Sequence, residues 1–157
     1  MKLNLSRFFY SKNFFIKANF LISFFALSGS FFFQYVMNFA PCPLCLLQRF
    51  CFILILTVSL FSFFLKIKEL FICSLNFLFI SSGILLTLRQ IYLQRFATYE
   101  PISCLPEDFL RTNIFNGSTN CSEIYYYILG LSLAEWSFII FLLLLSLNII
   151  YIKNKTN

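Results

Sequence analysis

The chain has 157 residues, of which 60% are hydrophobic and 11% are charged, and its formal net charge is +6. Its mean hydropathy of +0.84 excludes a soluble globular domain, in which about 45–50% of residues are apolar and about 25% are charged. The composition therefore predicts an integral membrane protein. A membrane-spanning helix needs about 20 predominantly apolar residues. Four such stretches occur, at about 14–37, 46–65, 69–93 and 132–152. They predict an all-α, four-helix transmembrane bundle that forms a single domain over residues 1–157.

Two of these stretches need a closer look. Residues 14–37 follow several cations, as the core of a signal peptide would, but the apolar run is too long and lacks a small-x-small cleavage site. We therefore interpret it as a retained helix. The stretch 69–93 is the weakest of the four candidates, because it contains Asn76 and Ser81-Ser82-Gly83 and carries Arg89 near its end. Such residues favour packing against other helices over full exposure to lipid.

The distribution of lysines and arginines predicts the orientation of the bundle. Eight of them lie before or at the start of the first helix, between the second and third helices, and after the fourth: Lys2, Arg7, Lys12, Lys17, Lys66, Lys68, Lys153 and Lys155. Cytoplasmic segments are enriched in such cations. Both termini are therefore expected in the cytoplasm, and the loops at about 38–45 and 94–131 on the outer face. No basic stripe interleaved with aromatic residues indicates binding to nucleic acid.

The most informative motif is the pair Cys42 and Cys45, which opens the second apolar stretch as Cys42-Pro43-Leu44-Cys45. A Cys-x-x-Cys pair closes a small, reactive disulfide, and a helix that starts at the pair biases its thiols toward thiolate. Arg49 follows Cys45 by four residues, about 6 Å along the same helix face. Its guanidinium can approach the Cys45 sulfur or a group bound beside it. The alternative is that Arg49 extends to the outer headgroups.

The predicted topology places four of the six cysteines on the outer face: Cys42, Cys45, Cys104 and Cys121. Disulfides persist in oxidising compartments outside the cytoplasm. Cys51 and Cys73 fall inside helices, where free cysteine behaves as a small hydrophobic residue.

The chain contains no histidine, which removes the commonest general base and any histidine-ligated haem, zinc or iron. A four-thiolate zinc site would need a second tight pair, but sixteen residues separate Cys104 from Cys121. The sequence therefore predicts catalysis by sulfur, without a metal.

Several segments together resemble one known family, the bacterial disulfide bond formation protein B (DsbB) family. They are Cys42-Pro-Leu-Cys45 with Gln48-Arg49, Leu88-Arg89-Gln90-Ile91-Tyr92-Leu93-Gln94, Cys104, Asn120-Cys121-Ser122-Glu123, Leu129-Gly130-Leu131 and Trp136. The resemblance covers nearly the whole chain. It implies a quinone-dependent thiol oxidoreductase of the bacterial inner membrane, which reoxidises a periplasmic DsbA-like dithiol oxidase and passes the electrons to ubiquinone or menaquinone.

The resemblance also implies a role for each cysteine. The reduced partner would attack Cys104 in a Cys104/Cys121 disulfide, and the freed Cys121 would attack Cys42. Cys45 would remain as a thiolate facing the quinone, with Arg49 stabilising that thiolate and a quinone oxygen. The positions along the chain agree with this order, because Cys45 is the deeper cysteine of its pair and Cys104 lies in the long outer loop.

The sequence departs from the family pattern at two places. The stretch between Cys104 and Cys121 is shorter than in some members, which restricts the rearrangement that brings Cys121 to Cys42. Gln90 stands where some members have histidine, so it is open either to a quinone contact or to a helix-capping role.

Two other classes of protein remain as alternatives. A vitamin K epoxide reductase-like quinone reductase usually has its active pair near a later helix. A non-enzymatic four-span scaffold with structural disulfides would not need Arg49 beside a helix-docked pair.

Overall fold

The computed structural model describes residues 12–38, 41–64, 69–96 and 127–156. Its elements in chain order are the helices α2 (Lys12–Tyr35), α3 (Pro43–Phe64) and α4 (Glu69–Phe96), the short strands β1 (Tyr127–Ile128) and β2 (Leu131–Ser132), and the helix α6 (Leu133–Thr156). All four helices are long and apolar enough to cross a membrane. The predicted four-helix transmembrane fold is thereby confirmed.

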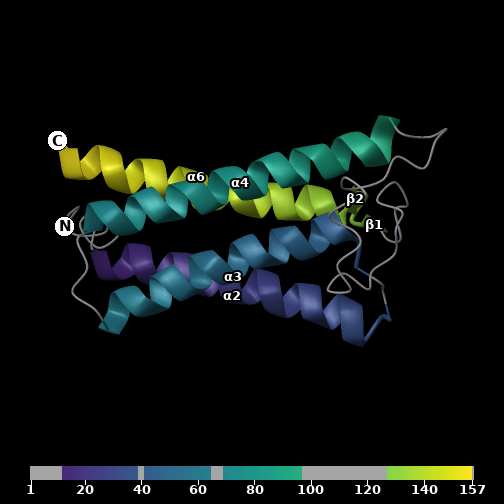
Figure 1. Cartoon of the computed structure of the whole chain (residues 1–157), viewed down its shortest axis with the longest axis horizontal. Coiled ribbons are helices and arrows are strands. Elements are labelled where there is room, and N and C mark those ends of the chain that lie inside the picture. The colour runs from purple at the N-terminus through teal and green to yellow at the C-terminus, as the bar shows by residue number, and fades with distance from the viewer. Residues whose placement is uncertain (1–11, 39–40, 65–68, 97–126, 157) are drawn as a thin grey trace, which may run out of the picture.

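The helices run alternately up and down and pack side by side along their lengths (Figure 1). The start of α2 and the end of α6 lie at one end of the bundle. The start of α3 and the two strands lie at the other, which we call the hairpin end. Four pairs of helices pack against each other, and of these α2 and α6 pack least closely. A cavity can therefore form between α2 and α6.

Helix α3 begins at Pro43, three residues earlier than the hydropathy predicts. Proline is favoured at the first helical position, because its missing N–H would have no partner there. Cys42 then occupies the N-cap position: its carbonyl accepts from Leu46 N at 3.1 Å, and its sulfur accepts from Cys45 N at 3.4 Å. The early start places Cys45 in the first turn of the helix.

A capping box begins α6. Ser132 N donates to Glu135 Oε2 at 2.8 Å, and Glu135 N donates to Ser132 Oγ at 3.3 Å. The same carboxylate pairs with Arg95 near the end of α4. This ion pair therefore links the start of α6 to the end of α4.

The strands β1 and β2 form a hairpin that the sequence analysis did not predict. Its two turn residues, Leu129 and Gly130, have φ values of 54° and 80°, the positive values that a tight hairpin turn requires. Trp136 on α6 donates its Nε1–H to the Ile128 carbonyl at 3.1 Å, which holds the hairpin against the bundle.

The core below the hairpin end depends on a close approach of α4 and α6. The Phe141 ring lies against Gly83, where a Cβ atom would overlap it. The same ring stacks on Phe52 of α3, with centroids 4.2 Å apart. Gly83 and Asn76 are both buried, as expected for polar and small residues that pack between helices.

Candidate functional site

Cys42 and Cys45 form a hydrogen-bonded dithiol at the start of α3, with their sulfur atoms 2.8 Å apart. Because a disulfide bond is about 2.05 Å long, the two sulfurs need only a small movement to close one. The hydrogen bond to Cys45, together with burial, raises the pKa of Cys42 above that of an ordinary thiol. Cys42 therefore keeps its proton at neutral pH.

Gln90 of α4 supplies a direct partner for both sulfurs. Its Nε2 donates to Cys45 Sγ at 3.1 Å and to Cys42 Sγ at 3.5 Å. Its Oε1 accepts from Gln48 Nε2 at 2.6 Å. Gln48 thus fixes which end of the Gln90 amide faces the sulfurs, because only the NH₂ end can donate. Both glutamines are buried.

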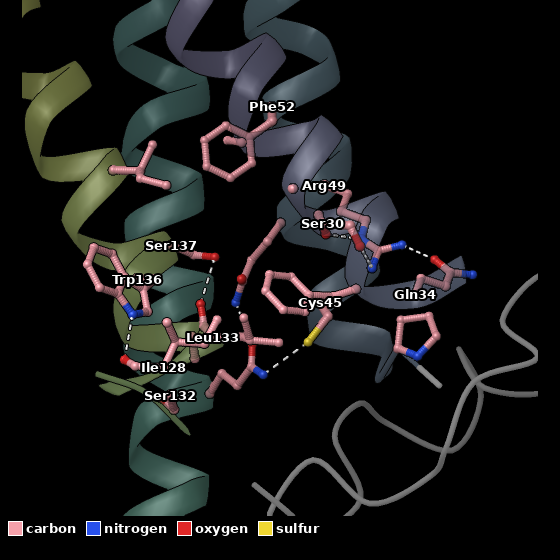
Figure 2. A pocket seen from close by; sticks show the side chains of 18 of the residues that line it. Ser30, Gln34, Cys45, Arg49, Phe52, Ile128, Ser132, Leu133, Trp136 and Ser137 are labelled. Atoms are coloured by element: carbon pink, nitrogen blue, oxygen red, sulfur yellow. Dashed lines mark hydrogen bonds between the residues drawn. The ribbon is translucent and has the colours of Figure 1, made fainter. Parts of the chain in front are cut away.

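Arg49 is anchored to α2. Its Nε donates to Ser30 Oγ at 2.5 Å, its Nη2 to the Ser30 carbonyl at 3.1 Å, and its Nη1 to Gln34 Oε1. The guanidinium also lies over the Phe31 ring, 5.3 Å from its centroid. Figure 2 shows this side chain turned toward Gln34. Among the described contacts, Arg49 makes no hydrogen bond to Cys45, so its positive charge acts on the sulfur through space.

A cavity of about 460 Å³ lies beside the dithiol, between α2 and α6. Cys45 and Arg49 of α3 line one side of it, and Trp136 of α6 lines the side across from them (Figure 2). Gln90 of α4 also lines the cavity. Most of the remaining wall is apolar. Phe25 of α2 lines the cavity and is also 67% exposed on the helix surface. The cavity therefore reaches the side of the bundle that faces lipid.

The chain matches the family model "Disulfide bond formation protein DsbB" over residues 12–151. It belongs to the DsbB family. It is 31% identical to the disulfide bond formation protein B of Stutzerimonas stutzeri over 123 residues, which are 69% of this chain and 75% of that protein. It is 32% identical to the protein of the same name from Nitrosococcus oceani over 136 residues, 76% of this chain and 77% of the relative. DsbB membership supports a disulfide oxidoreductase role for a multi-pass membrane protein.

The structure brings Cys42, Cys45, Arg49 and Gln90 to one cavity. Cys104 and Cys121 lie outside the described residues. Gln90 does not cap α4, which continues to Phe96, and its amide faces the sulfurs instead.

The sequence analysis did not assign roles to three polar residues of this DsbB site: Gln48, Ser30 and Gln34. A signal for two of them existed, because Ser30 and Gln34 are polar residues spaced four apart near the end of a mostly apolar helix. That spacing does not predict that both residues bind Arg49.

Proposed function

We propose that this chain is a thiol:quinone oxidoreductase, a single membrane domain in the bacterial inner membrane with its active cysteines on the periplasmic side. In this proposal it reoxidises a periplasmic DsbA-like dithiol oxidase and passes the electrons to a membrane quinone. The observation that carries the proposal is the position of Cys45, which lines a mostly apolar cavity that reaches the lipid-facing surface. A membrane-dissolved acceptor can reach the Cys45 sulfur without crossing water.

The residues around the cavity fit a quinone. Small-molecule sites commonly measure about 300–1,000 Å³ and are apolar with a few well-placed polar groups, and this cavity has about 460 Å³. Aromatic side chains suit the ring and the apolar tail, whereas the N–H groups of Gln90 and Arg49 suit carbonyl oxygens. When bound, a quinone supplies a sink for two electrons and two protons. Ubiquinone and menaquinone share this chemistry.

The protein's own groups account for the sulfur chemistry. In the proposed relay the partner's thiolate attacks Cys104 and displaces Cys121, whose thiolate attacks Cys42 and breaks the Cys42–Cys45 bond. Cys45 then leaves as a thiolate, stabilised by the N–H of Gln90, the start of α3 and the charge of Arg49. The partner's second thiolate then attacks its own sulfur in the mixed disulfide, so that the partner leaves as a disulfide and Cys104 is freed as a thiolate. Cys104 attacks Cys121 and displaces Cys42, which takes up a proton, as its raised pKa favours.

The proposal is tested with purified protein in detergent, mixed with a reduced DsbA-like oxidase and a short-chain quinone. The loss of quinone absorbance measures turnover. We expect Cys45→Ser to abolish turnover and Arg49→Ala to raise KM more than it lowers kcat. Cys73→Ala, at a buried cysteine far from the cavity, serves as the matched control. A wild-type rate no faster than that of Cys45→Ser would overturn the proposal and leave a scaffold with structural disulfides.

The direction of the relay has its own test. We expect a mixed disulfide with the partner to accumulate at Cys104 when Cys121 is replaced by alanine. Trapping at Cys121 in the Cys104→Ala variant alone would reverse the order of the two outer cysteines. A membrane-impermeant maleimide applied to intact spheroplasts tests the side of the membrane. It should label the reduced outer pair, and labelling only after lysis would contradict the orientation.

A further inference from the structure

A second polar region lies inside the bundle, far from Cys42 and Cys45. Asn19 of α2, Asn76 of α4 and Asn148 of α6 are each at most 1% exposed, and Ser23 of α2 and Ser59 of α3 are 0% exposed. We call these five residues the asparagine layer. On α3 the layer lies fourteen residues beyond Cys45, about 21 Å along the helix axis. It is therefore separate from the thiol site.

Apolar side chains close the asparagine layer on both sides. On the side nearer the start of α2 and the end of α6, one buried cluster contains Phe15, Cys73 and Tyr151. The Phe15 and Tyr151 rings stack there with centroids 4.4 Å apart. Each of these residues precedes or follows an asparagine of the layer by three or four positions, which is one turn on the same helix face. Toward the thiol site, Ile80 and Leu144 belong to the next apolar cluster, again one turn away. The three asparagines therefore lie at one level and point into the bundle.

The layer contains six buried polar atoms that have no hydrogen-bond partner among the described residues. They are Asn19 Oδ1, Ser23 Oγ and both amide ends of Asn76 and Asn148. The other end of the Asn19 amide donates to the Phe15 carbonyl at 2.9 Å. Leaving a buried polar group unpaired costs about 1–3 kcal/mol, and inside a bilayer no external water offsets that cost. Six such atoms at one level indicate a ligand that both donates and accepts.

We infer that the asparagine layer is an internal hydration site, in which ordered water molecules bridge α2, α4 and α6. Water matches the set of atoms because it donates twice and accepts twice, and a buried water commonly makes about three hydrogen bonds to otherwise unpaired groups. A metal cation matches less well. All members of the layer are neutral, so a cation would be buried without a compensating charge.

Hydroxyl-radical labelling with a short X-ray pulse, in water enriched in heavy oxygen, tests this site. The pulse makes radicals at bound waters, and these label the side chains next to them. Phe15, 4% exposed beside the layer, and Phe141, 0% exposed in the apolar cluster, form a matched pair of buried rings. We expect heavy-oxygen label at Phe15 at least about tenfold above that at Phe141, because only Phe15 has buried water within reach.

A double variant, Asn76→Leu with Asn148→Leu, removes four of the six unpaired polar atoms of the layer at nearly constant volume. Label at Phe15 should fall about tenfold in it, while label at the exposed Tyr35 stays unchanged. Equal label at Phe15 in the wild type and the variant would overturn the inference, because the labelling water would then not depend on the amides that are said to hold it between α4 and α6. No label at Phe15 in the wild type would also overturn it, in favour of a dry layer with direct amide contacts. This wild-type measurement decides the question even where the double variant does not fold.

Discussion

Replacing Gln90 with leucine tests how the thiolate is stabilised. Leucine fills a similar volume but cannot donate to the sulfur that Gln90 Nε2 contacts at 3.1 Å. The substitution also deprives the buried Gln48 amide of its acceptor. The variant therefore has two separable effects, one on the reactivity of Cys45 and one on the stability of the fold.

The size of each effect follows from the geometry. A hydrogen bond to a charged group contributes about 1.5–3 kcal/mol, and each 1.4 kcal/mol is a factor of ten. The thiolate form of Cys45 should thus become about ten- to a hundredfold less favourable. The unpaired Gln48 amide should lower the free energy of unfolding by about 1–3 kcal/mol.

The assay is the alkylation of Cys45 in the reduced protein by iodoacetamide at neutral pH, followed by mass spectrometry. Alkylation reports the thiolate because the thiolate is the nucleophile, so its rate should fall by about ten- to a hundredfold. Gln94→Leu is the matched control, one turn along the same helix and on the same cavity wall. Equal alkylation rates in the two leucine variants would refute the role of Gln90.

Three further predictions concern packing, the hairpin turn and pH. Gly83→Ala should lower the free energy of unfolding by about 1–3 kcal/mol through overpacking. Gly29→Ala should not lower it, because a Cβ atom at Gly29 would have no other atom within 4 Å. Thermal denaturation of the two variants measures the difference. Leu129→Asn should raise the melting temperature, because a φ of 54° costs asparagine about 1 kcal/mol less than it costs leucine. An unchanged melting temperature would contradict this prediction. Alkylation of Cys42 should begin only above the pH at which an ordinary thiol ionises, since a raised pKa delays its thiolate, and Cys45→Ala should lower that pH by removing the main cause. Mass spectrometry at stepped pH values measures it.

The sequence predicts the helices well because lipid imposes a simple rule, a long apolar run for each crossing. It also locates the reactive pair, since Cys42 and Cys45 are neighbours in the chain and their spacing alone brings them together. The early start of α3 also depends on a feature of adjacent residues. Proline favours the first helical position, so Pro43 begins the helix before the apolar run itself starts. Features set by adjacent residues are thus within reach of sequence reasoning.

The partners across helices are not predictable in the same way. Gln48 and Gln90 are 42 positions apart, and their contact depends on how α3 and α4 are rotated about their axes. The partners of Arg49 on α2 also depend on how the helices are rotated about their axes. A helix that is apolar on every face gives no sequence pattern from which this rotation can be predicted. The hairpin escaped prediction because each of its strands has only two residues, too few for an alternating pattern.

The contact between Arg95 and Glu135 has a consequence for the chain that joins α4 to the hairpin. By fastening the end of α4 to the start of α6, it holds both ends of that connection at the hairpin end of the bundle. Cys121 is seven positions from Ile128, which lines the cavity, so its reach from the cavity wall is at most about 25 Å. Two reacting groups joined by a short stretch of chain have effective concentrations of about a millimolar. In the proposed relay, exchange within one molecule would therefore outcompete exchange between molecules at ordinary protein concentrations, even with the short stretch between Cys104 and Cys121.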